Sequence, residues 1–148
     1  MDAEALFRYA LRLLSARAYT KWGLRQKLAR RGPPPVVEEV VGRLRRLGYL
    51  DDRSYAQGYA RLHAGRWGPA RLGRALREKG VPSAIVEEVL AEQAAQHDPV
   101  GEAQALLKRY PSRHKGDRVR AVRFLLNRGY TLEQALEAWK AHCAEGDT

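Results

Sequence analysis

The sequence has almost no cysteine. Cys143 is the only one among 148 residues, which excludes an internal disulfide framework and is typical of a protein kept in a reducing compartment. No apolar run approaches the roughly 20 residues that a membrane-spanning helix needs. The N-terminal stretch is amphipathic, with arginines inside its periodic pattern, so we do not expect a signal peptide. We therefore expect a cytoplasmic protein.

Patterns that would indicate an enzyme or a metal site are also missing. The glycines stand singly and never form the GxxxxGKS or GxGxxG order that holds a nucleotide phosphate. The histidines are not paired at i, i+4, nor do they lie at zinc spacing from a cysteine. We therefore predict no catalytic residue, no metal site and no cofactor. The four histidines are expected at the solvated surface or an interface: His63, His97, His114 and His142.

Two further features could suggest chemistry, namely Cys143 and the pair Asp51-Asp52. Cys143 has no indicated histidine partner and acid, so we predict a half-buried packing residue. A short carboxylate at the start of a helix accepts hydrogen bonds from free backbone N–H groups. Asp51 or Asp52 is therefore predicted to cap a helix and not to form a catalytic or metal-binding pair.

Acidic residues are outnumbered by basic ones. Lys and Arg total 27 against 17 Asp and Glu, which gives a net charge of +10, and 45% of the residues are apolar. Such a chain is globular, and its charge predicts attraction to polyanions or to an acidic protein face. Arginine outnumbers lysine by 21 to 6, which favours bidentate contacts to phosphate or carboxylate. A compositional bias of the source genome would produce the same ratio.

Apolar residues recur at helical spacing along the whole chain, and no stretch alternates as a strand does. The helices are predicted at residues 3–17, 21–31, 36–47, 53–64, 69–79, 83–93, 99–110, 118–128 and 132–143. Thr20 is expected to cap the second helix, residues 32–35 to form a stiff stop before the third, and Gly48 to end the third in the left-handed conformation. Residues 111–117 are interpreted as a mobile polar linker.

The apolar face of each helix predicts its buried residues. Glu38 and Glu39 are expected in the first turn of the third helix, where they complement the positive end of its dipole. The inward residues are predicted to be Leu6, Ala10, Leu13, Leu14, Leu24, Leu28, Val37, Val40, Val41, Leu44, Leu47, Tyr55, Ala56, Tyr59, Ala60, Leu62, Leu72, Ala75, Leu76, Ile85, Val89, Leu90, Leu132, Leu136 and Trp139.

The order of basic helix, glycine, turn and amphipathic helix occurs three times. Gly32, Gly80 and Gly129 lie 48 and 49 residues apart, a period typical of helical repeats. We predict an all-α fold of three tandem three-helix repeats, residues 1–50, 51–96 and 97–148, stacked into an elongated, curved array. The alternative is a single irregular bundle whose internal similarity arose by chance.

Basic residues recur at equivalent places in the three repeats. If the repeats stack in register, these side chains would form one basic strip that contacts a partner, although a run of charges on one helix is often only a solvated face. The second helices contribute Arg25, Lys27, Arg30, Arg31, Arg71, Arg74, Arg77, Lys79, Arg118, Arg120, Arg123 and Arg128, and the third helix adds Arg43, Arg45 and Arg46. Trp22 and Trp67 precede two of these helices, where a ring either packs against the adjacent repeat or stacks on a base or partner.

The motifs GYLDDRSYAQGYA and GPARLGRALREKGV, residues 48–60 and 68–81, resemble the RecX regulatory family, the bacterial modulators of the RecA recombinase. LxxKLxxRG in the first repeat and FLLNRGY in the third extend the resemblance over nearly the whole chain, while the run Pro33–Pro35 departs from the family's usual turn. The residues that carry the motifs are largely structural in the family: Gly48, Tyr49, Leu50, Asp51, Asp52, Tyr55, Ala56, Gly68, Arg71, Leu72, Leu76, Lys79, Gly80 and Val81.

The resemblance implies a non-enzymatic regulator in recombination, DNA repair and the SOS response. Such a protein lies in the groove of the RecA–DNA filament and slows filament growth, ATP hydrolysis and strand exchange. Its expected partners are the RecA filament and single- or double-stranded DNA, contacted directly or through RecA, and it is expected to be a monomer. Two alternatives remain open, a stand-alone DNA-binding repeat protein and an adaptor for another acidic partner.

Overall fold

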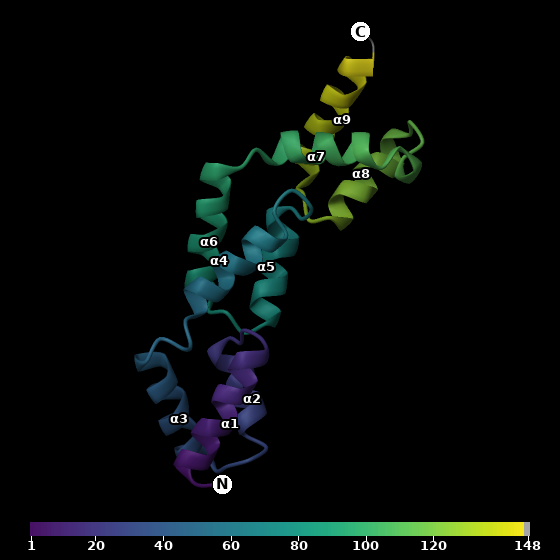
Figure 1. Ribbon diagram of the computed structural model, residues 1–148. Coiled ribbons are helices and arrows are strands. Elements are labelled where there is room, and N and C mark those ends of the chain that lie inside the picture. The colour runs from purple at the N-terminus through teal and green to yellow at the C-terminus, as the bar shows by residue number, and fades with distance from the viewer. Residues whose placement is uncertain (147–148) are drawn as a thin grey trace. The chain divides into compact units, whose positions relative to one another are not determined.

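The computed structural model describes residues 1–146 and is helical throughout (Figure 1). Its elements in chain order are α1 (Ala3–Ala16), α2 (Lys21–Leu28), α3 (Pro34–Arg46), α4 (Asp52–Leu62), α5 (Pro69–Glu78), α6 (Ser83–Gln96), α7 (Pro99–Arg109), the 3₁₀ helix η1 (Pro111–Arg113), α8 (Arg118–Asn127) and α9 (Leu132–Gly146). Residues 1–146 contain no strand, and none of their helices is long and apolar enough to cross a bilayer. The predicted all-α fold is confirmed.

The chain divides into two compact units. The first unit contains residues 1–59 and 76–86, and the second contains residues 60–75 and those from 87 onward. The division falls inside α4, α5 and α6, so each of these helices contributes to both units. The repeat boundaries at residues 50 and 96 stay a prediction.

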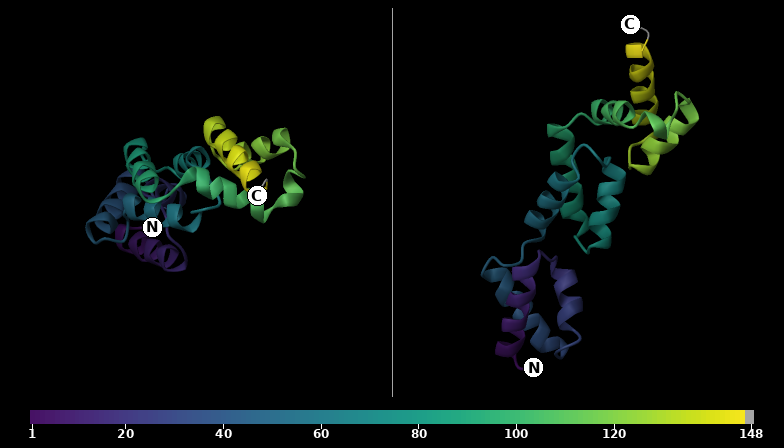
Figure 2. Two further views of the ribbon diagram at one scale, coloured as in Figure 1. Left: turned by 90° about the horizontal axis from the view of Figure 1, so that it is seen from above. Right: turned by 45° about the vertical axis from the view of Figure 1, so that its right-hand side comes forward.

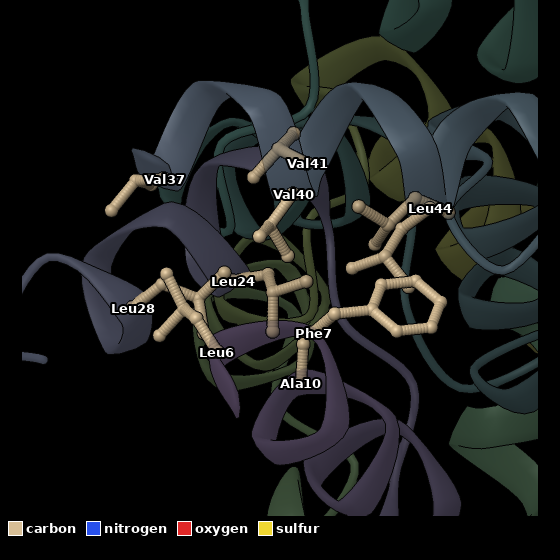
Figure 3. Close-up of a cluster of buried hydrophobic side chains, with 10 residues drawn as sticks. Leu6, Phe7, Ala10, Leu24, Leu28, Val37, Val40, Val41 and Leu44 are labelled. Atoms are coloured by element: carbon tan, nitrogen blue, oxygen red, sulfur yellow. The ribbon is translucent and has the colours of Figure 1, made fainter. Parts of the chain in front are cut away.

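The core of the first unit lies between α1, α2 and α3. Figure 3 shows apolar side chains of these three helices converging. Their exclusion from water stabilises the unit by roughly 1.5–3 kcal/mol for each large side chain. Most predicted inward residues of this region are confirmed, and Phe7 is an addition that the sequence reasoning missed. The buried cluster is Leu6, Phe7, Ala10, Leu24, Leu28, Val37, Val40, Val41, Leu44 and Leu50.

The boundaries of α2 and α3 differ from the prediction. Thr20 caps α2 as expected, because its Oγ1 accepts from the Gly23 N–H at 3.0 Å. The helix ends at Leu28, so Arg30 and Arg31 lie in the following turn. α3 begins at Pro34 instead of Val36, because proline lacks only an N–H that would be unpaired in a first turn anyway.

The early start of α3 overturns two expectations. The first turn of α3 contains no acidic residue, so Glu38 and Glu39 lie one turn further along than predicted. The helix also ends one residue earlier than predicted, at Arg46. Leu47 therefore becomes its C-terminal cap, with 56% of its surface exposed. Leu47 is therefore not a core residue. Leu62, the last residue of α4, is 64% exposed for a different reason, because it lies on the opposite side of the helix from the buried Ala56 and Ala60.

The turn between α3 and α4 shows how the predicted stop and start are built. Gly48 adopts φ 85° and ends α3 as predicted, with the Tyr49 N–H donating to the Leu44 carbonyl at 2.9 Å. Asp51 caps α4, because one carboxylate oxygen accepts from the Ser54 N–H at 3.1 Å. Asp52 is buried and accepts from the Lys21 N–H at 2.9 Å. The two adjacent carboxylates thus serve the starts of two different helices.

The core of the second unit lies between α7, α8 and α9, which pack together (Figure 2). α9 turns two alanines inward, Ala135 and Ala138, while Leu136 and Trp139 are only partly buried. Leu132, predicted as a core anchor, is 56% exposed. Small side chains allow the backbones of neighbouring helices to approach closely, so the alanines and not the leucine define the packed face of α9. The buried cluster is Ala103, Leu106, Leu107, Ala121, Leu125, Tyr130, Ala135 and Ala138.

Residues 111–117 are structured, contrary to the predicted mobile linker. They contain η1 and His114, whose side chain is only 3% exposed. Nε2 of His114 lies 2.9 Å from the Leu107 carbonyl, and Nδ1 accepts from the Gly116 N–H at 3.0 Å. Both ring nitrogens are therefore satisfied by the neutral imidazole with its proton on Nε2. The expectation of a surface histidine is wrong at this position.

Candidate functional site: the basic side chains

Two of the predicted contact arginines are neutralised by carboxylates of their own unit. Arg25 binds Glu38 through both branches of its guanidinium, with Nε–Oε1 at 2.8 Å and Nη2–Oε2 at 3.2 Å. Arg43 binds Glu4 at 2.9 Å and lies over the Phe7 ring at 3.9 Å. Exposed ion pairs of this kind stabilise a fold by only about 0–1 kcal/mol. They nevertheless reduce the positive charge that these two side chains offer to a partner.

Three further arginines lie against aromatic rings. Arg31 is 4.3 Å from the centre of the Tyr9 ring, and Arg71 is 4.3 Å from that of Trp67. Arg128 lies between 5.1 and 5.4 Å from the rings of Phe124 and Tyr110. The guanidinium charge is attracted to the electron-rich face of each ring. These arginines therefore have a packing role, whatever else they contact.

The remaining predicted contact residues are exposed, and no ion pair holds them to another residue in the range 1–146. They lie in both units, on or next to the basic helices α2, α5 and α8, and at the end of α3. Exposed cations of this kind are available to a polyanion or an acidic protein face. They are Lys27, Arg30, Arg45, Arg46, Arg74, Arg77, Lys79, Arg118, Arg120 and Arg123.

The exposed arginines occur in two different settings. In the first unit, Arg45 and Arg46 line a groove together with Lys21 and Arg53. In the second unit, Arg118 and Arg123 lie at a groove of α8 and α9 that is otherwise lined by apolar side chains, with Val119 62% and Leu126 42% exposed. The first groove combines these cations with two carboxylates, Asp51 and Asp52. The second combines two cations with apolar surface, a composition that suits an acidic protein surface with apolar side chains.

The basic helices meet end to end at two joints, which the sequence did not predict. In the first unit, the Thr20 hydroxyl at the start of α2 donates to the Lys79 carbonyl after α5 at 2.5 Å. Beside it, Gly80 has φ 89° and lies so close to Trp22 that an added Cβ would overlap the indole. In this joint the C-terminal carbonyls of α5 therefore meet the N-terminal residues of α2.

The second joint repeats this construction inside the second unit. The Gly68 N–H donates to the Arg128 carbonyl at 2.7 Å, and the Ala70 N–H donates to the Gly129 carbonyl at 3.1 Å. Gly129 has φ 96°, and an added Cβ would overlap the backbone of Arg71. The start of α5 thus supplies donors to the unpaired carbonyls at the end of α8, which satisfies both helix ends. The regular spacing of Gly80 and Gly129 was the only sequence signal of these joints.

Most residues of the two sequence motifs have structural roles in the helices, turns and joints. Leu72 and Leu76 are buried, and Gly48, Asp51, Asp52, Gly68 and Gly80 have the turn, cap and joint roles described above. Tyr55 is half-buried, and burial together with the nearby Tyr59 raises the pKa of its hydroxyl. Tyr49 differs from the rest, because it is 55% exposed and lines a surface groove.

The histidines and Cys143 do not come together as a metal site in the described part of the chain. Residues 1–146 contain no group of three or more His, Cys, Asp or Glu side chains that could hold a metal ion. His97 lies 3.0 Å from Glu102, while the His63 ring stacks on Trp67 with 3.7 Å between ring centres. Burial, Arg66 and Arg71 lower the pKa of His63. Cys143 is exposed and not half-buried as predicted, because α9 turns other residues inward.

This chain matches two domain models and several relatives of one protein family. The profile described as "RecX, first three-helix domain" matches residues 7–44, and that described as "RecX, second three-helix domain" matches residues 51–90. The Regulatory protein RecX of Thermus thermophilus is 48% identical over 99% of this chain and 98% of its own. That of Halorhodospira halophila is 37% identical over 92% of this chain and 87% of its own.

Solved structures show the same fold. The crystal structure of RecX from Lactobacillus salivarius superposes with a TM-score of 0.84 and covers 97% of both chains at 20% sequence identity. A second crystal structure, of a regulatory protein RecX, has a TM-score of 0.80 and covers 94% of this chain and 73% of its own. Together with the matched three-helix domains, these structures confirm the predicted helical-repeat fold.

Proposed function

The chain belongs to the RecX family of regulatory proteins, and on that premise we propose that it regulates the RecA recombinase by binding the RecA–DNA filament. It lies in the groove of the filament and slows filament growth, ATP hydrolysis and strand exchange. It acts by occupying a surface and performs no catalysis. The observation that carries this proposal is the occurrence of exposed, unpaired basic side chains at equivalent places in a helical-repeat chain.

The exposed cations support contact with a filament because both of its components are negatively charged where they face a groove. Arg74 and Arg77 are exposed on α5, and Arg120 and Arg123 are exposed on α8. Guanidinium groups bind phosphate and carboxylate in the same bidentate way, so one set of side chains serves DNA and an acidic protein face.

The two joints support the proposal in a different way. Each brings the end of one basic helix to the start of another, α5 to α2 in the first unit and α8 to α5 in the second. Successive basic helices are therefore connected by direct hydrogen bonds and close glycine contacts. We propose that the cations of each joined pair of helices contact the filament together.

The proposal is tested by RecA-dependent ATP hydrolysis on single-stranded DNA. We expect the added protein to inhibit hydrolysis, and a variant with Arg74→Glu and Arg77→Glu to need at least tenfold more protein, on the order of one lost charge-assisted hydrogen bond of about 1.5–3 kcal/mol. Arg8→Glu with Arg12→Glu is a matched control, because both residues are exposed on α1 and the change in net charge is the same.

Two results would contradict the proposal. One is the absence of inhibition at several-fold excess of the protein over RecA. The other is an equal loss of inhibition in the two double variants, which would make net charge alone responsible. Circular dichroism of each variant, with unchanged helical signal, ensures that the loss is not caused by unfolding.

The net charge of +10 favours one alternative, a stand-alone DNA-binding protein. Such a protein binds bare DNA as tightly as it binds a filament, and its affinity falls steeply with salt because each neutralised phosphate releases counterions.

A further inference from the structure

Aromatic side chains are concentrated at one surface of the first unit. The chain has 3 Trp, 7 Tyr and 2 Phe, and five of these residues line two grooves beside the start of α2 and the start of α4. Neither groove contributes to the core cluster between α1, α2 and α3, apart from the partly buried Leu14 and Tyr19. The five residues are Tyr19, Trp22, Tyr49, Tyr55 and Tyr59.

The two grooves are adjacent. Both are lined by Ala18, Tyr19 and Tyr55, and their volumes are about 400 and 460 Å³. Each volume lies within the range of about 300–1,000 Å³ that is usual for sites of small organic ligands. We call the combined depression the aromatic groove.

The rings of the aromatic groove are held in place without being covered. Trp22 packs its Cβ, Cγ and Cδ2 side against Gly80, yet 49% of its surface stays exposed. Tyr49 is 55% exposed. Tyr55 and Tyr59 are stacked, with 6.1 Å between ring centres and 19° between planes. Rings that are already fixed lose little conformational freedom when a ligand binds, which favours stacking on them.

Cations border these rings. The Arg17 guanidinium lies 4.5 Å from the centre of the Tyr19 ring, and Lys79 lines the same half of the aromatic groove. The first unit contains 14 Lys and Arg against 7 Asp and Glu, so it carries +7 of the total charge of +10. Two carboxylates also line the groove, Glu78 in this half and Asp51 in the other. A carboxylate suits the amino groups of bases and disfavours a nearby phosphate.

We propose that the aromatic groove binds the bases of a single-stranded nucleic acid by stacking, with Arg17 and Lys79 contacting the adjacent phosphates. Aromatic faces accept any base, and each stacked base strengthens binding by about 5-fold to 150-fold. A duplex does not fit this description, because its bases are already stacked on each other. Tyrosine, tryptophan and arginine also form protein-binding surfaces, but the bordering cations and the surplus charge of the first unit favour a polyanion carrying planar rings.

This site goes beyond the contact with RecA proposed above, and strand binding tests it without RecA. The full chain is titrated with three labelled strands of equal length, about 16 nucleotides: dT, abasic deoxyribose phosphate, and rU. The dT and abasic strands have the same backbone charge and differ only in their bases. We expect dT to bind at least about tenfold more tightly than the abasic strand. The rU strand shows whether the sugar matters to the site.

Variants assign the effect to the aromatic groove. Trp22→Leu with Tyr49→Leu removes the two most exposed rings at unchanged charge, and leucine retains apolar contact with Gly80. We expect this pair to lose most of the preference for dT over the abasic strand while keeping its affinity for the abasic strand. The control pair Arg45→Gln with Arg46→Gln, outside the groove, should weaken both strands equally and leave the preference intact.

Two outcomes would overturn the proposal. The first is equal affinity of the unchanged protein for the dT and abasic strands. The second is a leucine variant that folds normally by circular dichroism and keeps the full preference for dT. If this variant instead loses inhibition of RecA without any change in strand binding, the groove is a protein contact and the nucleic-acid assignment is wrong.

Discussion

Adjacent residues of the same type have different physical roles in this chain, and Asp51 and Asp52 are the clearest case. Asp51 is exposed and caps its own helix, α4. Asp52 is buried and pairs with the first N–H of α2, a helix 31 residues earlier in the chain. A cap affects one helix end, whereas a buried carboxylate with a distant partner fixes the position of one helix relative to another.

We predict that Asp52→Ala is more damaging than Asp51→Ala. The first change leaves the partly buried Lys21 N–H without a partner and should lower the free energy of unfolding by about 2 kcal/mol. The second removes an exposed cap and should lower it by about 1 kcal/mol. Urea denaturation followed by circular dichroism measures both values. Equal losses would show that Asp52 acts only as a second cap.

The pH dependence provides a control for Asp51. Hydrogen bonds from the Ser54 N–H and hydroxyl lower the pKa of its carboxyl below the ordinary value. A lowered pKa stabilises the fold above the ordinary pKa, and this contribution is lost as the pH falls through the folded-state pKa. Because Asn also caps helices, Asp51→Asn keeps the cap and loses only the negative charge. Near neutral pH the variant should therefore be less stable than the unchanged protein by the contribution of that charge alone. That difference should disappear in acid.

Among the helices, tertiary contacts decide what the sequence pattern leaves open. The positions of the helices followed from apolar spacing, glycine stops and the Thr20 cap, all of which act within a few residues. The inward face of α9 did not follow, because spacing favours leucines while close packing selects Ala135 and Ala138. The joints also could not be predicted, since Thr20 and Lys79 are 59 residues apart.

The same limit applied to the candidate contact residues. The sequence singled out fifteen basic side chains as contacts, and ten of them are exposed with neither an ion pair nor a cation–π contact in the described range. It did not indicate that Glu38 and Glu4 neutralise Arg25 and Arg43, because these carboxylates lie 13 and 39 residues away. Nor did it bring Tyr19, Tyr49 and Tyr55 to one groove, which depends on how the chain folds back on itself.

The joint between α5 and α2 is testable with two glycines that share a conformation. Gly80→Ala and Gly48→Ala both place a Cβ at positive φ, which costs about 1–2 kcal/mol. Only at Gly80 does the new Cβ meet Trp22, whereas nothing lies within 4 Å at Gly48. We expect Gly80→Ala to lower the free energy of unfolding by a further 1–3 kcal/mol, about the cost of overpacking. Thermal and urea denaturation of both variants measure the difference, and equal losses would argue against a tight joint.

At the level of the whole molecule, two features support the proposed function: the family to which the chain belongs, and a surplus of positive charge that the chain does not neutralise itself. The net charge of +10 is distributed over both units. Charge alone attracts any polyanion, so it does not separate a filament regulator from a general DNA-binding protein. Preference for the filament over its DNA separates them, because only the regulator gains from contacts with RecA.

The most direct measurement is therefore the affinity of the labelled protein for RecA filaments preassembled on a single strand, compared with its affinity for the same strand without RecA at the same salt concentration. We predict binding to the filament that is at least tenfold tighter, a free-energy difference of about 1.4 kcal/mol. Equal or weaker binding to the filament would contradict the proposed regulation of RecA and leave a general nucleic-acid-binding protein.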